Sequence, residues 1–358
     1  MLHPVPDSTQ RARLLEVVEL QRQLMESLCA QPVGAVVDQA WLRGVWPAMP
    51  EDWVERFWSI PKDTTLAAKP GKRSTWIATI AAASLADKLT VRGLMAEQLR
   101  FEELYRTPPT IRLTKHNWNP PVFSAVNELL KSFYAPLFYK EEGFHNPDGT
   151  RFHKEHFINP RPRICPYTDN AIQDTKLDHF LPKDQFPMLS CHPDNLIPCS
   201  TDANSGGQKG TQIPLDTEDA DQAGAWFHPR WRSAQRTYFL QFPAGPDPQP
   251  RVQFIANATA DQPRLDNMER MFSLSDFWGR CLDDEVQSVA GDVQGWLHED
   301  GKELTETSVR DCVLKRARQE RRRIGRDGLA IVKSWFYEHI ADTPVLLAQV
   351  VRTCENGT

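Results

Sequence analysis

Apolar residues recur at helical spacing over much of the first 140 positions. Between residues 10 and 30 they fall on one stripe, which predicts an amphipathic helix. Packing of that stripe into a core is favoured over a groove for a partner helix. The stripe comprises Leu14, Val17, Val18, Leu24, Met25 and Leu28. Further helices are predicted over 41–61, as a tryptophan-rich helix-turn-helix, over 74–106 and over 121–134.

The pattern changes in the segment 163–210. A short apolar run ends in an Asp-His pair at 178–179, and a polar loop with several prolines follows. Asn195 then leads into a second apolar run, Leu196 to Pro198. The next positions offer side chains that cap helix N-termini: Ser200, Thr201 and Asp202. We therefore expect a strand, a long loop, a second strand and a short helix.

The remaining third of the chain is mostly helical in pattern. Two short strands are predicted at 238–242 and 252–255, on either side of a proline-rich turn. Helices follow over 274–296, 308–324 and 329–351. The sequence thus predicts a mostly helical α+β protein of three units. These are a helical N-terminal domain at 1–140, a central domain at 141–260 that holds the strands, and a helical C-terminal domain at 261–358.

Composition narrows the class of protein. The 358 residues carry 42 Lys and Arg against 47 Asp and Glu, a net charge of −5. Any binding of nucleic acid must then come from local basic patches or from a partner subunit. No apolar run approaches the roughly twenty residues of a membrane-spanning helix, and the first residues do not resemble a secretory leader. The 7 cysteines are odd in number and scattered, which favours reduced thiols in a cytoplasm.

The 163–210 segment carries residues suited to phosphodiester chemistry. Asp178 and Asn204 are hard oxygen donors, the type that Mg²⁺ or Mn²⁺ prefers. His179 points to the opposite face of its strand, because side chains alternate there, and neutral imidazole can accept a proton from water near neutral pH. Asn195 can fix the loop or the imidazole by hydrogen bonds. Lys209 can meet a phosphate as a point charge.

The order of these groups resembles the HNH endonuclease motif, whose fold is a ββα-metal finger. The matching stretches are L-D-H-F-L-P-K, F-P-x-L-S, P-D-N-L-I-P and N-x-x-x-x-K-G, within roughly fifty residues. The resemblance implies that Asp178 and Asn204 bind the metal, that His179 is the general base and that Asn195 orients it. It also implies Mg²⁺- or Mn²⁺-dependent hydrolysis of DNA to 5′-phosphate and 3′-hydroxyl ends. Such proteins often act in bacterial anti-phage defence or restriction, sometimes beside an ATPase subunit.

The segment departs from many relatives in its cysteines. They frame the finger with two C-x-x-C pairs that hold a structural zinc ion. Here the first pair reads Cys165-Pro-Tyr-Thr168, and the second would fall at Ser200 and Ala203. Structural zinc needs four nitrogen or sulfur ligands, so we expect none here and expect packing to brace the finger instead.

Basic residues outside the finger are candidate DNA contacts. Arg161 and Arg163 precede the finger, and the 308–324 helix is rich in Lys and Arg. The candidates on that helix are Lys315, Arg316, Arg318, Arg322 and Arg323. A solvated helix face is the alternative explanation for this charge. His228, in a His-Pro element after the finger, is a candidate for lining the site, although a structural role is favoured.

Two other functions compete with a DNA endonuclease. One is a non-catalytic module that binds nucleic acid or a partner through a decayed finger, for which the missing thiolates argue. The intact set of Asp178, His179, Asn195 and Asn204 argues against it. The other is an RNA-directed nuclease with the same catalytic groups.

Overall fold

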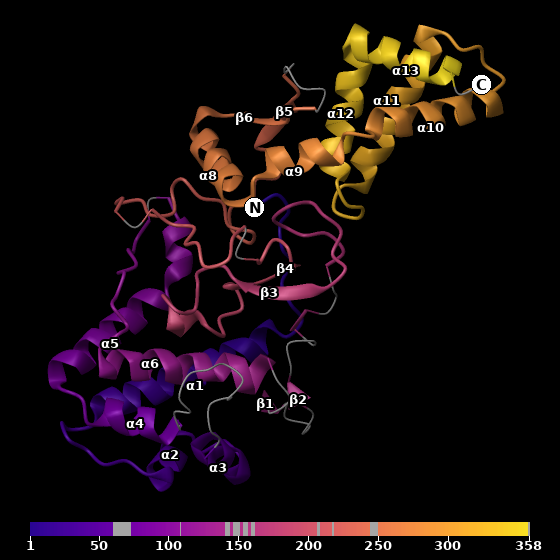
Figure 1. Cartoon of the computed structure of the whole chain (residues 1–358). Coiled ribbons are helices and arrows are strands. Elements are labelled where there is room, and N and C mark those ends of the chain that lie inside the picture. The colour runs from indigo at the N-terminus through magenta and orange to yellow at the C-terminus, as the bar shows by residue number, and fades with distance from the viewer. Residues whose placement is uncertain are drawn as a thin grey trace.

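A computed structural model describes the chain except residues 60–72, 108, 140–143, 146–150, 153–156, 159–161, 206–207, 217, 244–249 and 357–358. Helices gather at the two ends of an elongated molecule, and a β-hairpin lies between them (Figure 1). The class is a mostly helical α+β fold, as predicted. No helix among the described residues has the length and apolar character needed to cross a membrane.

The N-terminal end confirms the predicted helices, with one correction. It contains α1 (Arg11–Ala30), α2 (Gln39–Val45), α3 (Glu51–Ser59), α4 (Arg73–Ala81), α5 (Leu85–Gln98), a 3₁₀ turn at Phe101–Tyr105, α6 (Pro121–Ser132) and a π-helix at Phe133–Tyr139. The single helix expected over 74–106 is wrong, because Ser84 starts a new one. Its side chain accepts a hydrogen bond from the backbone N–H of Asp87, which caps α5.

The described strands form three two-stranded antiparallel sheets. They are β1 (Phe144–His145) with β2 (Arg151–Phe152), β3 (Thr175–His179) with β4 (Leu196–Ser200), and β5 (Tyr238–Gln241) with β6 (Gln253–Ala256). The last four agree with the predicted strands. We call β3, β4 and the segment between them the finger hairpin.

The short helix expected after β4 is absent from the described residues, which form turns at 201–205 and 208–211. Local side-chain hydrogen bonds explain the difference. The hydroxyl of Ser205 donates to the carbonyl of Asp202 at 2.7 Å, and the backbone N–H of Ala203 donates to Ser200 Oγ at 3.4 Å. Small polar side chains that bond to the nearby backbone compete with a helix for the same groups.

The C-terminal end is a set of packed helices. It contains α8 (Gln262–Phe272), α9 (Leu274–Cys281), α10 (Glu285–Glu299), α11 (Glu306–Arg323), α12 (Ala330–Asp342) and α13 (Pro344–Asn356). The single helices predicted over 274–296 and 329–351 are each divided instead, the first into α9 and α10 and the second into α12 and α13. A cluster of buried Glu285 and Tyr337 with half-buried Lys333 joins α10 to α12, and Lys333 Nζ lies 2.5 Å from the Glu285 carboxylate.

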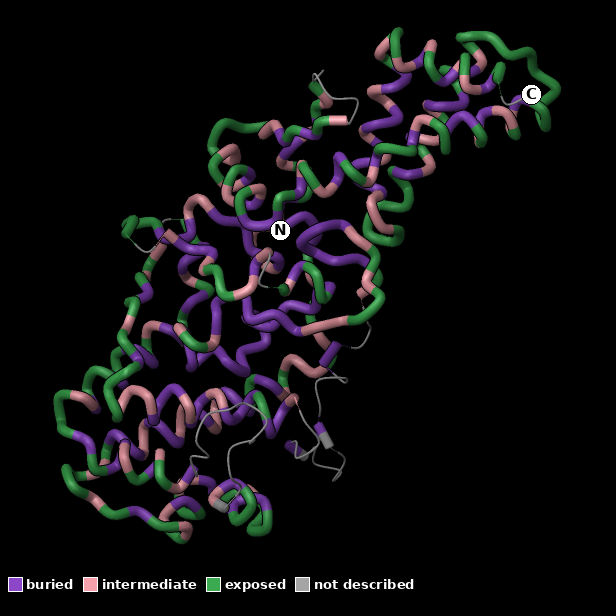
Figure 2. The backbone as a smooth tube through the Cα atoms, in the orientation of Figure 1, coloured by how far each residue is buried: buried purple, intermediate pink, exposed green. Residues whose placement is uncertain are grey.

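The finger hairpin lies between two hydrophobic cores and contributes to both. On one face Leu177 and Leu196 belong to the core of the N-terminal helices. On the other face Ile197 and Cys199 belong to the core that extends into α8–α13. All five residues of β4 are therefore buried, as the tube in Figure 2 shows.

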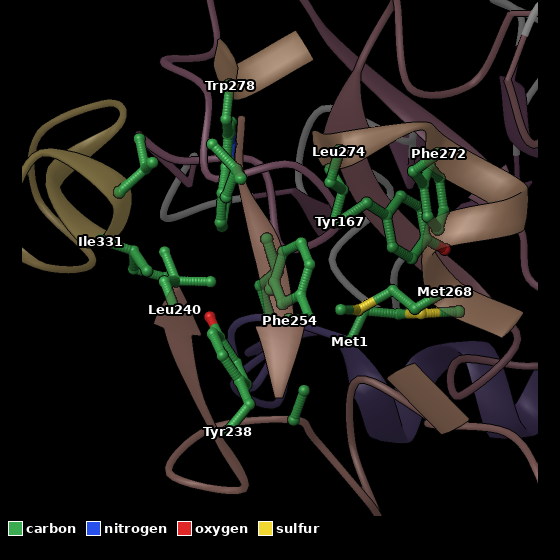
Figure 3. Close-up of a cluster of buried hydrophobic side chains, with 14 of the residues drawn as sticks. Met1, Tyr167, Tyr238, Leu240, Phe254, Met268, Phe272, Leu274, Trp278 and Ile331 are labelled. Atoms are coloured by element: carbon green, nitrogen blue, oxygen red, sulfur yellow. The ribbon is translucent and has the colours of Figure 1, made fainter. Parts of the chain in front are cut away.

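Several aromatic residues pack in the second core, among aliphatic and methionine side chains (Figure 3). Tyr167 stacks on Phe272 of α8 with ring centroids 5.0 Å apart. Trp278 of α9 packs on Phe254 of β6 at 5.1 Å, and its indole N–H donates to the carbonyl of Thr168 at 3.1 Å. These contacts place the residues just before β3 against the C-terminal helices.

Candidate functional site

The register of the finger hairpin places the Asp-His pair on opposite faces, as the sequence predicts. Asp178 lies opposite Ile197 and His179 lies opposite Leu196. The Asp178 carboxylate meets Tyr167, which belongs to the second core. The His179 ring packs edge-on against Tyr134, from the π-helix after α6, with centroids 4.3 Å apart. The two side chains thus face different cores.

Asp178 is buried and has two partners. Its carboxylate is 3 % exposed and accepts a hydrogen bond from the Tyr167 hydroxyl at 2.7 Å. Lys209 Nζ lies 3.0 Å from the same carboxylate and 2.8 Å from the carbonyl of His179. The Lys209 side chain is completely buried, so this ammonium faces Asp178 and not solvent. Lys209 was expected to contact phosphate, and here it has an internal partner instead.

His179 is held in one tautomer. Its Nε2 lies 2.9 Å from the carbonyl oxygen of Ser190. Since a carbonyl only accepts, the proton is on Nε2 and Nδ1 carries the lone pair. Among the described residues, none forms a hydrogen bond with Nδ1. Burial and, to a smaller extent, the cation of Lys183 lower the pKa of His179 to about 3, so the ring is neutral near pH 7.

Asn195 organises the loop that carries Ser190. The side chain is fully buried, and its Oδ1 accepts from the backbone N–H of Leu181 at 2.7 Å. Its Nδ2 donates to the carbonyls of Leu181 at 3.0 Å and Leu189 at 3.1 Å. Because Leu189 precedes Ser190, Asn195 steadies the carbonyl that meets His179. This agrees with the loop-fixing role considered for Asn195.

No hydrogen bond joins Asn204 to Asp178 among the described residues. It is half-buried, and its backbone N–H reaches the carbonyls of Ser200 and Thr201 at 3.3 and 3.2 Å. Without a helix after β4, Asn204 lies in the turn at 201–205.

The cysteines in and just before the finger hairpin are buried free thiols. Cys165 and Cys199 share the second core, and burial raises the pKa of Cys199 well above its ordinary value. No group of three or more His, Cys, Asp or Glu side chains in the described part of the chain is arranged to hold a metal ion. A site with one carboxylate, one amide and water ligands, which the sequence predicts, is not of that kind.

His228 is packed inside an aromatic cluster. It is fully buried, stacks on Trp231 at 4.1 Å and meets Phe180 at 4.4 Å. Its Nδ1 accepts from the backbone N–H of Arg230 at 3.1 Å, which leaves Nε2 without a partner among the described residues. Burial lowers the pKa of His228 well below its usual range. These contacts give the residue a structural environment.

Sequence reasoning missed a buried ion-pair cluster beside Asn195. Asp194 is 2 % exposed and receives two hydrogen bonds from the Arg11 guanidinium of α1, one of them at 2.6 Å. Arg230 Nε lies 3.3 Å from the same carboxylate. Arg11 and Asp194 are 183 positions apart, so no local spacing could have indicated the pair. The cluster joins α1 to the segment between β3 and β4.

The candidate DNA contacts lie in different surroundings. Arg163 is exposed, and Arg161 lies outside the described residues. On α11, Arg316 and Arg323 form ion pairs within the chain, with Asp292 at 3.3 Å and Glu320 at 3.2 Å. The remaining candidates of that helix are exposed: Lys315, Arg318 and Arg322.

Comparison with known proteins adds no relative to this description. No protein-family model, no curated protein and no solved structure matches the chain.

Proposed function

We propose that this chain is an HNH-type endonuclease that hydrolyses phosphodiester bonds of DNA with the help of a divalent cation. The observation that carries the proposal is the hydrogen bond from His179 Nε2 to the Ser190 carbonyl. Together with the Asn195 brace, it sets the lone pair of Nδ1 in a defined direction. A general base needs a lone pair held in a defined direction, and this hydrogen bond to the Ser190 carbonyl supports that arrangement.

In the proposed reaction His179 takes a proton from water at Nδ1. The resulting hydroxide attacks phosphorus in line with the 3′ oxygen, the bond between phosphorus and that oxygen breaks, and the oxygen takes a proton from a second water. A pKa of about 3 makes buried His179 a weak base. The negative charge of a phosphodiester bound beside the ring favours the imidazolium and raises that pKa toward neutrality.

Asp178 and Asn204 would hold Mg²⁺ or Mn²⁺ only after Lys209 leaves the Asp178 carboxylate. Both carboxylate oxygens already have partners, the Tyr167 hydroxyl and the Lys209 ammonium. The cation would neutralise charge on the phosphate and on the leaving oxygen. Displaced from Asp178, Lys209 carries the positive charge suited to a phosphate contact.

The same Lys209–Asp178 pair favours a second function. A lysine that neutralises the carboxylate permanently would leave no place for a divalent cation, and His179 is only 8 % exposed. Such a finger would be a non-catalytic module that binds nucleic acid or a partner protein. The two functions differ in whether the purified chain cuts.

The test is a nicking assay on supercoiled plasmid DNA with Mg²⁺, with Mn²⁺ and with a chelator, run beside matched RNA. The parent protein is expected to nick DNA only with metal. His179→Ala is expected to lose nicking by at least a hundredfold, which is the low end of general-base contributions of about 10²–10⁴. Its binding of DNA should persist, with an unchanged circular dichroism spectrum.

Three outcomes would contradict the proposal. If the His179→Ala variant cuts DNA as fast as the parent, His179 is not the general base. A parent that binds DNA and never cuts supports the non-catalytic module. A parent that cuts RNA and not DNA assigns the RNA-directed alternative. A role in anti-phage defence and an ATPase partner were expected only for a DNA endonuclease. Both stay predictions.

A further inference from the structure

The arginines of α11 and of the turn that follows it fall into two sets. Arginines of the first set form ion pairs within the chain: Arg310 with Asp342 at 2.9 Å, Arg316 with Asp292, Arg321 with Glu338 at 2.5 Å, and Arg323 with Glu320. The second set is Arg318, Arg322 and Arg326, which we call the arginine stripe. These side chains are exposed, and no described residue forms an ion pair or a side-chain hydrogen bond with them.

Two members of the arginine stripe share one face of the helix. Arg318 and Arg322 are four residues apart and therefore share a face of α11. Arg326 lies four residues further, in the turn just after the helix ends at Arg323. Successive side chains of the stripe are separated by roughly 6 Å along the axis where the chain is helical. Duplex DNA presents a charge about every 1.7 Å of its length, so separate guanidinium groups can meet separate phosphates.

The end of α11 is fixed to the segment that precedes β3. The loop between α11 and α12 passes so close to Ala171 that a Cβ on Gly328 would lie 2.7 Å from its backbone nitrogen. Buried Asp169 accepts hydrogen bonds from the backbone N–H groups of Leu329 at 2.7 Å and Ile331 at 2.9 Å. Figure 1 shows this loop reaching the central region from the C-terminal helices. The stripe therefore has a set position relative to the finger hairpin.

A cavity of about 370 Å³ joins these surfaces. Ile324 and Gly325, between two members of the stripe, line it together with Arg163 and with Pro198 of β4. Pro198 lies opposite Leu177, which directly precedes Asp178. Arg163 thus lies between the end of α11 and the finger hairpin, at a cavity that Arg230 and Asp7 also line.

We propose that the arginine stripe binds the phosphate backbone of duplex DNA without reading its sequence. Arginine suits this ligand because its guanidinium can donate two parallel hydrogen bonds to a phosphate. The unpaired charge is local, which reconciles binding of a polyanion with a net charge of −5. The inference rests on the proposed function for the identity of the ligand as DNA, and it does not require the finger to be catalytic.

The test compares two triple variants that remove the same charge from the same part of the molecule. One carries Arg318→Gln, Arg322→Gln and Arg326→Gln. The matched control carries Arg310→Gln, Arg321→Gln and Arg323→Gln, which are exposed but ion-paired. Binding of a fluorescent duplex is measured by anisotropy at several salt concentrations in the presence of a chelator, so that no cleavage occurs.

Loss of the stripe is expected to make the slope of log K against log salt shallower by about 3, at roughly 0.9 for each phosphate contact. The control is expected to keep the slope of the parent. The proposal is overturned if both variants change equally, if the stripe variant binds like the parent, or if the parent binds only single strands or RNA. If the protein binds duplex DNA through the stripe but does not cut it, the endonuclease proposal is contradicted and the binding proposal stands.

Discussion

Replacing Lys209 with Met is expected to destabilise the fold strongly, because it leaves the Asp178 carboxylate charged and buried. At an effective dielectric constant near 20, two unit charges 3.0 Å apart attract by about 5 kcal/mol. Breaking a buried pair costs about 3–5 kcal/mol in practice. The Tyr167 hydroxyl can satisfy one oxygen of the remaining carboxylate but does not neutralise it. We therefore expect Lys209→Met to lower the free energy of unfolding by about 3–5 kcal/mol.

A double-mutant cycle separates this pair from general damage to the core. Asp178→Asn alone leaves the Lys209 ammonium buried without its carboxylate and is expected to be similarly destabilising. The double variant is expected to cost less than the sum of the two by about 2–3 kcal/mol. Urea unfolding followed by circular dichroism measures all four proteins. Additive effects, or a Lys209→Met variant as stable as the parent, would refute the reasoning.

Two further predictions concern buried polar groups of the central region. Asn195→Ala is expected to lower the free energy of unfolding by about 2–4 kcal/mol, because the Leu181 N–H loses its acceptor in the interior; an unchanged urea midpoint would contradict this. Acid is expected to destabilise the folded protein as pH falls below about 6.5. Histidines in the unfolded chain bind protons in this range, whereas the buried histidines of the folded protein stay neutral because their pKa values are lowered. The pKa of His192 is lowered to about 4 by burial, and that of His228 is lowered well below its usual range. His228→Phe should reduce the loss of stability between about pH 7 and about pH 5, while the Arg230 N–H, which loses its acceptor, lowers the free energy of unfolding at pH 7 by about 1–3 kcal/mol; a pH-dependent loss equal to that of the parent would show that His228 does not contribute.

The predictable part of the site is the part encoded by neighbouring residues. Alternation along β3 was enough to place Asp178 and His179 on opposite faces. The proline-containing loop after β3 indicated where the second strand begins, and Asn195 marked its start. Spacing alone therefore supports the strand-loop-strand core of the motif.

The surroundings of those residues depend on contacts between distant segments. Tyr134, which packs on His179, comes from the N-terminal helices, and Arg11 reaches Asp194 across 183 positions. Burial of Lys209 also required knowledge of the fold, because a lysine before glycine ordinarily suggests an exposed turn. The predicted helix after β4 failed for a local reason, the hydrogen bonding of Ser200 and Ser205 to nearby backbone groups.

The participation of β3 and β4 in both cores has a mechanical consequence. Leu177 and Leu196 lock the strands to one helical end of the molecule, while Ile197 and Cys199 lock them to the other. A fragment cut out around these strands would expose apolar surface on both sides at once, so it should not fold by itself. Partial unfolding of the helices at either end would therefore displace Asp178 and His179. The position of this pair depends on both ends of the molecule being folded.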